Sequence, residues 1–260
     1  MLNCIKLAGH CGTENVCSIM RFGIFSDIHS NIEALNSVLS AYEVEGIDKY
    51  LCVGDIVGYG TDPKECIKTI RERNIATVAG NHDWATSGKF SIEHFSPYAK
   101  TAVLWTKKQI DASEADYLDN LNLIYEDADF CLVHGTLLKP ECFNYLYELS
   151  DAKDTFEVMQ PRLCFVGHTH SPIIFGRDSE RISYVKEGHI NVEPNKQYII
   201  NVGSVGQPRD GDTRACLCIY DSKEKVVQIK RVEYDIKAAQ TKILNAGLPP
   251  SLANRLVVGQ

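Results

Sequence analysis

The stretch Gly80-Asn81-His82-Asp83 follows Ile75-Ala76-Thr77-Val78-Ala79, a short apolar and β-branched run that predicts a buried strand. The glycine frees the backbone to turn at the end of this strand. Next, the amide oxygen of Asn81 can bind a metal ion, and the imidazole of His82 can give a proton to a leaving oxygen. Asp83 can hold that imidazole in one tautomer. Each of these three side chains suits one task at a metal-assisted phosphoryl centre, and the inference depends on whether similar motifs recur along the chain.

A predicted strand that ends in metal-binding side chains occurs four more times, and the strands are expected at 20–26, 49–53, 129–133 and 163–166. Because the carboxyl ends of strands in an open α/β sheet converge on one crevice, we expect these side chains to lie together. Seven oxygen or nitrogen ligands are too many for one ion and suit two ions that share a carboxylate. With the proton donor His82, the set is Asp27, His29, Asp55, Asn81, His82, His134, His168 and His170.

Each motif alone also has an ordinary structural explanation, because a single histidine after a strand is usually a turn or surface residue. A sheet does not need this set in order to fold, and five such motifs in succession are hard to reach by chance. Five of the eight histidines lie at these strand ends. The other three, His10, His94 and His189, lie outside the pattern, and we expect them at the surface.

Composition and charge restrict the class of protein. The 260 residues are 44% hydrophobic and 23% charged, which is ordinary for a globular domain. The net charge of −7 argues against binding of nucleic acid through the overall charge of the protein. No apolar run approaches the ~18 residues of a membrane span. Ten cysteines without framework spacing indicate reduced thiols, and we expect a cytoplasmic protein.

Residues 1–19 show no helical or strand period and no apolar core of signal-peptide length. We expect a loose N-terminal extension over 1–19 and a single domain over 20–260, because Met20 opens a strong strand directly. The alternative is a zinc site in the extension, although its candidate ligands lack paired C-x-x-C spacing. These candidates are Cys4, His10, Cys11 and Cys17.

The five motifs together resemble the motif set of the calcineurin-like metallophosphoesterases: Asp27-x-His29, Gly54-Asp55, Gly80-Asn81-His82-Asp83, His134-Gly135 and Gly167-His168-x-His170. The segment from Asn201 to Asp210 is similar to a small prokaryotic branch of phosphodiesterase-like or diadenosine-tetraphosphatase-like members. The resemblance implies an α/β fold, a four-layer α/β/β/α sandwich of two mixed β-sheets flanked by helices. It also implies two metal sites that share one carboxylate: Asp27, His29, Asp55 and His170 for one ion, and Asp55, Asn81, His134 and His168 for the other.

The chemistry of such a site follows from its ligands. Two cations bridged by Asp55 can share a water and supply hydroxide near neutral pH, which attacks phosphorus in line. His82, oriented by Asp83, protonates the leaving alkoxide. The mixed nitrogen and oxygen ligands suit Mn, Fe, Zn or Ni and do not choose among them. Of the four, we expect Mn. Arg209 follows a glycine-rich turn; we expect it to bind substrate phosphate, and the alternative is a solvated loop arginine.

The substrate class is narrowed by one departure from related families. In Ser/Thr protein phosphatases and symmetrical dinucleoside tetraphosphatases an arginine lies inside the second motif, but 54–60 contains none. We therefore expect a phosphodiesterase of a small nucleotide-like substrate; phosphomonoesterase and dinucleoside polyphosphate hydrolase are the alternatives. A non-catalytic metal-binding scaffold is less favoured, because every ligand is present. Aromatic residues that can stack on a base or pack in the core are Trp84, Phe90, Phe95, Phe143, Tyr145 and Tyr147.

Overall fold

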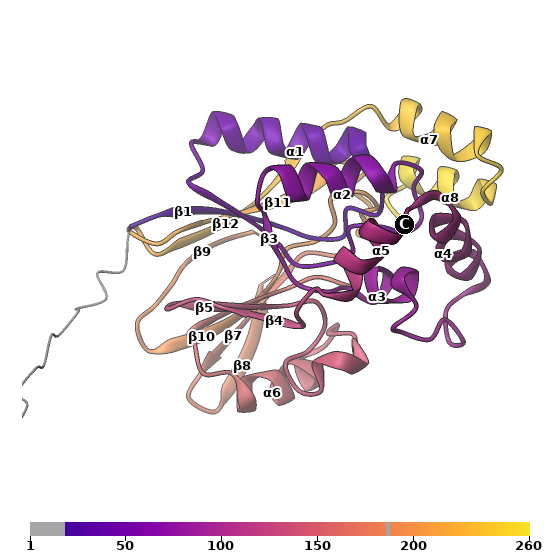
Figure 1. The fold of residues 1–260 in the computed structure, drawn as a ribbon. Helices are drawn as coiled ribbons and strands as arrows, with labels where there is room; N and C mark the ends of the chain where they lie inside the picture. Colours follow the sequence, from indigo (N-terminus) through magenta and orange to yellow (C-terminus); the bar gives the residue numbers. More distant parts are fainter. Residues whose placement is uncertain (1–18, 186–187) are drawn as a thin grey trace, which may run out of the picture.

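The computed structural model describes residues 19–185 and 188–260. Two six-stranded sheets lie face to face in the middle of the molecule, and helices cover their outer faces (Figure 1). The expected four-layer α/β/β/α sandwich is confirmed. Nearly all of the predicted N-terminal extension, with its four candidate zinc ligands, lies outside the described residues. Among the described helices, none has the length and apolar run that a membrane crossing requires.

The first sheet has the order β3-β2-β1-β11-β12-β9. Its first three strands run parallel to one another, and β1 pairs antiparallel with β11, so the sheet is mixed. The strands are β1 (Arg21–Phe25), β2 (Lys49–Cys52), β3 (Ala76–Thr77), β9 (His189–Asn191), β11 (Ala215–Asp221) and β12 (Val226–Val232).

The second sheet has the order β4-β5-β6-β10-β7-β8 and is also mixed. Its parallel strands β5, β6 and β10 end at the edge where β1, β2 and β3 end in the first sheet, which brings the predicted motifs together. The strands are β4 (Ile124–Glu126), β5 (Phe130–Val133), β6 (Leu163–Val166), β7 (Ile173–Asp178), β8 (Arg181–Val185) and β10 (Lys196–Asn201).

Helices cover both outer faces and one end of the sandwich (Figure 1). In that view α1 and α2 lie over the first sheet and α6 lies under the second. Asn31 is the N-cap of α1, and its side-chain oxygen accepts a hydrogen bond from the N–H of Ala34 at 3.1 Å. The helices are α1 (Ile32–Glu45), α2 (Pro63–Glu72), α3 (Asn81–Ser87), α4 (Pro97–Gln109), α5 (Ala112–Asp119), α6 (Leu149–Val158), α7 (Ile236–Asn245) and α8 (Pro250–Asn254), with 3₁₀ turns η1 (Pro140–Cys142) and η2 (Arg255–Val257).

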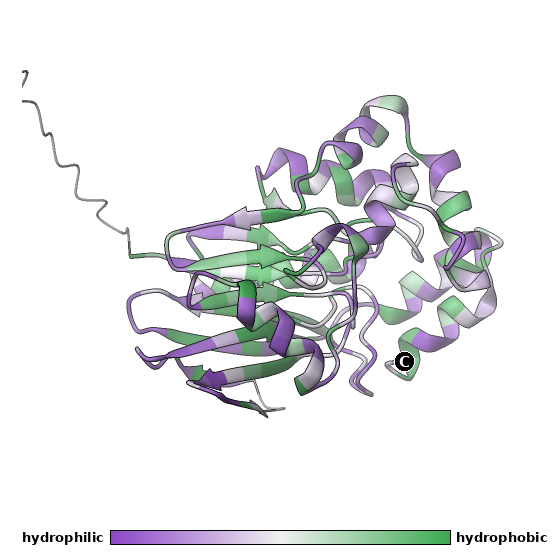
Figure 2. Cartoon of the chain, turned by 90° about the horizontal axis from the view of Figure 1, so that it is seen from below, coloured by the Kyte–Doolittle hydropathy of each residue, from purple (hydrophilic) through white to green (hydrophobic). Residues whose placement is uncertain are grey.

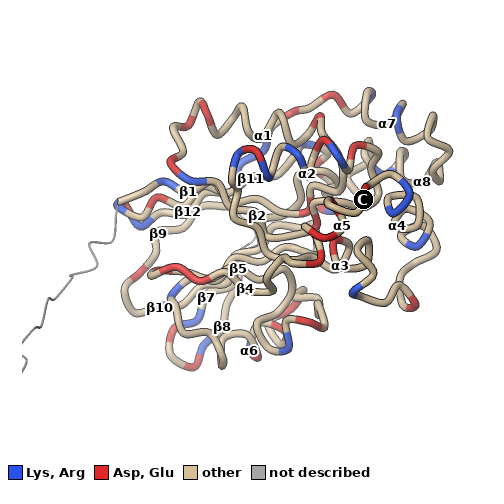
Figure 3. Tube along the Cα trace, in the orientation of Figure 1, with Lys and Arg blue, Asp and Glu red and all other residues tan. Residues whose placement is uncertain are grey.

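Three apolar layers stabilise this arrangement. The central layer lies between the sheets and includes Ile24 of β1, Phe165 of β6 and Tyr220 of β11. A second layer packs α1 and α2 on the first sheet, and a third packs α6 on the second sheet. Figure 2 shows the hydrophobic residues concentrated along the strands. Acidic and basic residues are intermixed on the helices and strand ends, in keeping with the net charge of −7 (Figure 3).

Candidate metal centre

The loops that follow the strands adopt unusual backbone conformations at the predicted ligands. Five of the ligands have a positive φ, between 48° and 68°. Such conformations are uncommon outside glycine, cost free energy and cluster at functional sites. They aim the side chains of neighbouring loops into one buried cluster. The five residues are Asp27, His29, Asp55, His168 and His170.

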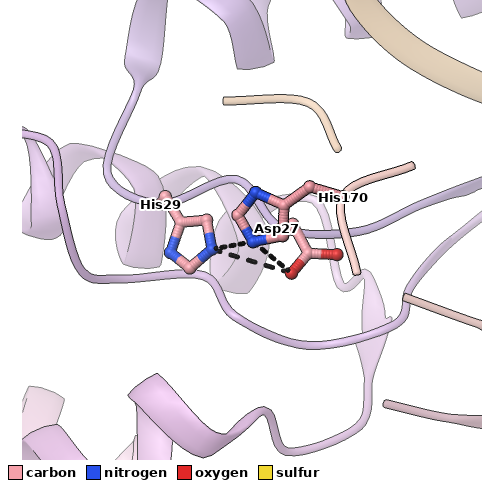
Figure 4. Close-up of side chains that lie close together, drawn as sticks. All are labelled: Asp27, His29 and His170. Carbon is pink, nitrogen blue, oxygen red and sulfur yellow. Dashed lines mark hydrogen bonds and ion pairs between the residues drawn. The ribbon is translucent and has the colours of Figure 1, made fainter. Parts of the chain in front are cut away.

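The first group of ligand atoms joins the loops after β1 and β6. Asp27 Oδ1 lies 3.3 Å from His170 Nε2 and 3.6 Å from His29 Nε2 (Figure 4). The Nε2 atoms of His29 and His170 are 3.0 Å apart. All three side chains are buried. Their ligand atoms are close enough to bind one cation.

The second group centres on Asp55, in the loop after β2. His134 Nε2, at the end of β5, lies 3.3 Å from Asp55 Oδ2, and His168 completes this group. His29 Nε2 lies 3.6 Å from the same Oδ2 atom, so Asp55 lies between the two groups. Asn81 is the first residue of α3, and its buried Oδ1 has no hydrogen-bond partner among the described residues.

Backbone carbonyl oxygens fix the orientation of three imidazoles. The Nδ1 atoms of His29, His134 and His170 each lie within hydrogen-bond distance of a backbone carbonyl oxygen, at 3.0, 2.7 and 2.6 Å. A carbonyl accepts only, so Nδ1 carries the proton and Nε2 presents a lone pair. The facing Nε2 atoms of His29 and His170 then repel unless a cation lies between them. This geometry fits a metal site.

The electrostatics of the site favour the same conclusion. Burial opposes ionisation of Asp27, but the neighbouring imidazoles, that of His170 first, hold its pKa well below the usual range. Burial lowers the pKa of His168 to about 3, and burial with the charge of Arg209 lowers that of His170 to about 4. Ionised carboxylates and neutral imidazoles are the forms that bind divalent cations. Burial opposes the charge on His134, but Asp55 raises the pKa of that imidazole to about 9, so His134 releases its proton when it binds a cation. With that proton released, the residues present fit divalent metal ions.

The contacts of Asp83 differ from its expected role as the residue that orients His82. Its carboxylate accepts hydrogen bonds from four backbone N–H groups, those of Asp55, Ile56, Val57 and Gly80, at 2.8 to 3.2 Å. The structure records no hydrogen bond between Asp83 and the His82 imidazole, whose buried Nδ1 has no partner among the described residues. The prediction that Asp83 orients this imidazole is therefore wrong. Asp83 instead fixes the loop that carries Asp55.

His82 lies beside the metal-ligand cluster. Its backbone N–H donates to Asp55 Oδ1 at 2.8 Å, and its ring centroid is 4.9 Å from that of His29. The rings of Tyr59 and Phe95 pack against it, with centroids at 4.6 and 5.0 Å. Burial lowers the pKa of His82 well below its usual value, so the imidazole is neutral in the free chain.

Two glycines are required by this packing. A Cβ at Gly80 would lie 2.0 Å from Asp55 Oδ1, and a Cβ at Gly58 would lie 2.5 Å from His82 Nδ1. Neither neighbour can move without leaving the cluster. The glycines of the second and third motifs therefore allow the backbone to approach the ligands closely.

Arg209 reaches the cluster from the loop after β10. Its backbone N–H donates to the carbonyl of His170 at 3.2 Å, and its Nη2 donates to Gln207 Oε1 at 2.8 Å. Its guanidinium carbon lies 5.5 Å from the ring centroid of Tyr59. Tyr59 belongs to the second motif, so a guanidinium from another loop reaches the motif that lacks its own arginine.

Two features of the site were missing from the expected set. Tyr59 contacts both His29 and His82, with ring centroids at 4.6 Å. Its place between two glycines of the second motif was a signal in the sequence. Arg255, in η2, donates to the same Gln207 oxygen as Arg209, at 3.2 Å. No motif surrounds Arg255, so the sequence contained no sign of this contact.

Four of the six aromatic candidates fall into two classes, and the other two, Phe90 and Phe95, are partly buried. The ring of Tyr145 stacks on that of His168 at a centroid distance of 3.9 Å and an angle of 14°, and Tyr147 stacks on Tyr145 at 5.2 Å. Both tyrosines are about half exposed, at 48% and 54%. Trp84 and Phe143 are buried and belong to the core. His94 and His189 are exposed, as expected.

Comparison with known proteins places the chain in a family. Residues 20–225 match the calcineurin-like phosphoesterase superfamily domain. An uncharacterized protein of Methanocaldococcus jannaschii is 43% identical over 241 residues, which are 91% of this chain and 97% of that protein.

Solved structures agree with this match. The structure of a metallophosphoesterase from Sphaerobacter thermophilus is 40% identical, with a TM-score of 0.82 over 93% of this chain and 100% of that one. A hypothetical protein from Pyrococcus horikoshii shares the fold at 19% identity, with a TM-score of 0.76 over 92% of this chain and 98% of that one. With the buried Asp and His groups described above, these matches show that the chain belongs to the calcineurin-like phosphoesterase superfamily and is a metallophosphoesterase, a hydrolase of phosphoric ester bonds.

Proposed function

We propose that this chain hydrolyses a phosphodiester of a small nucleotide-like substrate with the help of two divalent metal ions. The observation that carries the proposal is the position of Asp55 between two groups of buried ligand atoms. One ion is assigned to Asp27, His29, Asp55 and His170, and the other to Asp55, Asn81, His134 and His168. Mn is the favoured metal. We assign this activity to the cytoplasm, following the thiol content of the sequence.

The residues around the ligands have separate roles. When bound, two divalent cations lower the pKa of a water molecule toward neutrality and neutralise charge on phosphoryl oxygens. His82 gives a proton to the leaving oxygen. Burial lowers the pKa of His82, and an anionic phosphate beside the imidazole would favour its protonated form. Asp83 keeps the backbone of the Asp55 loop in place.

Arg209 binds the substrate phosphate in this proposal. Its guanidinium stacks on Tyr59, which contacts His29 and His82, so it lies within reach of a phosphate held at the cluster. A guanidinium also matches phosphate oxygens in geometry and charge.

The nucleotide-like part of the substrate is assigned to Tyr145 and Tyr147. Their rings form a half-exposed stack that begins on the ligand His168. A base can continue such a stack because every base has an aromatic face. The stack supports a nucleotide-like diester over an aliphatic one, whereas phosphomonoesterase and dinucleoside polyphosphate hydrolase remain the alternatives to the diesterase.

The test is hydrolysis of bis(p-nitrophenyl) phosphate against p-nitrophenyl phosphate, with added Mn²⁺, by wild type and H82A. We expect diester turnover in the wild type and its collapse in H82A. Turnover of the monoester alone would make the protein a phosphomonoesterase. If neither ester reacts while two metals are bound, a library of nucleotide esters separates a narrow substrate range from a non-catalytic scaffold.

A further inference from the structure

Two arginines share one neutral acceptor beside the metal-ligand cluster. Arg209 Nη2 and Arg255 Nη1 both donate to Gln207 Oε1, at 2.8 and 3.2 Å. Because both donate to a single atom, the two guanidinium groups lie side by side. Gln207 is buried, and its backbone carbonyl accepts a hydrogen bond from His170 Nδ1 at 2.6 Å. The arginine pair is thus tied to a ligand of the cluster.

No carboxylate of the described residues neutralises either guanidinium. Within 19–185 and 188–260, neither Arg209 nor Arg255 forms an ion pair with a carboxylate, and the buried Nε of Arg209 has no hydrogen-bond partner. Burial and the charge of Arg209 lower the pKa of Arg255. Two adjacent, partly buried like charges are unfavourable, and an anion between them removes the penalty.

The fold holds Arg255 in this position. The neighbouring Leu256 and Leu252 are buried in an apolar cluster with Tyr59, which joins α7, α8 and η2 to the site. Beyond η2, the carbonyl of Gly259 accepts a hydrogen bond from the N–H of Gly211 at 2.9 Å. The loop that carries Arg209 and the segment that carries Arg255 are therefore fixed to each other.

We propose that Arg209 and Arg255 together bind a second phosphoryl group, joined directly to the scissile phosphate, so that the substrates are esters of the nucleoside diphosphate class. A scissile phosphate at the metal-ligand cluster can reach Arg209, and the next phosphate along the chain then meets Arg255. Gln207 Oε1 holds the two guanidinium groups next to each other until the anion binds. A phosphate that carries an ester on one side and a second phosphate on the other is still a disubstituted centre, so this inference deepens the proposed function and rests on it.

The experiment compares AMP and ADP as competitive inhibitors of bis(p-nitrophenyl) phosphate hydrolysis, with Mn²⁺ in excess over nucleotide. The adenosine is common to both inhibitors, so the ratio of their inhibition constants isolates the second phosphate. We expect ADP to inhibit the wild type at a concentration about tenfold lower than AMP, the size of one charge-assisted contact. In R255A and R255Q the ratio should fall to about one. R73A is the matched control, because Arg73, which follows α2, pairs with Glu43 at 3.0 Å at the surface and should leave the tenfold ratio unchanged.

Each outcome decides the inference. A ratio near one in the wild type, or a tenfold ratio that survives in both R255A and R255Q, overturns it. The ratio is internal to each variant, so a general loss of activity cancels, and R255Q keeps a hydrogen-bonding side chain if R255A fails to fold. If the wild type hydrolyses neither p-nitrophenyl ester, the proposed function is decided by the library of nucleotide esters, separately from this inference. Calorimetric titration with AMP and ADP then measures the same ratio without turnover.

Discussion

Asp83 Oδ2 accepts a hydrogen bond from the backbone N–H of Asp55 at 2.8 Å, while Asp55 Oδ1 accepts one from the N–H of His82 at 2.8 Å. Asp83 and His82, the third and second residues of α3, thus hold the backbone N–H and the side-chain carboxylate of Asp55. The backbone of Asp55 is strained, with a φ of 55°, and these bonds keep it in that conformation. The carboxylate assigned to bridge the two metals is positioned by the start of α3.

The substitution D83A should destabilise the protein rather than alter proton transfer. It leaves four backbone N–H groups without their acceptor in a fully buried place, which costs about 3 kcal/mol or more. Urea unfolding measures the loss. D129N, which removes a partly exposed carboxylate paired with Lys225, should cost less than about 1 kcal/mol. A D83A protein as stable as wild type, with only its pH–rate profile changed, would restore the role of Asp83 on the imidazole.

Loss of the shared carboxylate should disturb both metal sites. Elemental analysis of D55N is expected to show fewer than two metal equivalents, whereas D129N should match the wild type. Metal addition should also raise the melting temperature of the metal-free wild type, because ligands that bind only the folded state stabilise it, by about 4 kcal/mol at a thousandfold excess over Kd. Full metal content in D55N would remove Asp55 from its bridging role.

The substitution H82A separates a proton donor from a metal ligand. His82 is close enough to His29 and Asp55 to join a third potential metal group, so geometry permits both roles. As the proton donor, it should lower kcat by about 10²- to 10⁴-fold when removed, with two metals retained. The exposed His189 provides the control H189A, for which kcat should not change. Loss of one metal equivalent in H82A would instead make His82 a ligand.

The metal-ligand cluster could be predicted because each ligand lies within four residues of the end of a strand. The strand pattern is local, and parallel strands such as β1, β2 and β6 end at the same edge of the sandwich. The expectation that Asp83 orients the His82 imidazole failed because adjacent residues on a helix point in different directions. Asp83 is the third residue of α3, where an acid reaches back to the helix start, so its position also indicated a capping role.

Contacts made by tertiary packing could not be predicted. Arg255 reaches the site because α7 and α8 pack their apolar faces on Tyr59 and α4, and no sequence motif specifies that docking. The stacking of Tyr145 on His168 likewise depends on the path of a loop between β5 and α6. In both cases the sequence supplies the residue type, and the partner comes from a distant segment.

The ion pairs around Asp212 should make the stability of the Arg209 loop depend on pH. A hydrogen bond from Arg214, at 2.7 Å, lowers the pKa of Asp212 to about 2. Its unfolded value is ~3.9, so its stabilisation is present above that pH and is lost as pH falls toward 2. The difference in unfolding free energy between wild type and D212N should be constant above pH ~5 and shrink below it. R214A should remove most of this difference, and a difference independent of pH would contradict the pairing.

The substitution Y145A should raise KM for nucleotide diesters more than it lowers kcat. Tyr145 stacks on both His168 and Tyr147. Loss of this stack should cost about tenfold in KM, since base–aromatic stacking contributes ~1–3 kcal/mol. Y145F keeps the ring and should behave as wild type. Y98A, which removes an exposed tyrosine of α4, is the control. An unchanged KM with reduced kcat would mean that Tyr145 only supports His168, and the nucleotide-like part of the substrate would lose its proposed binding surface.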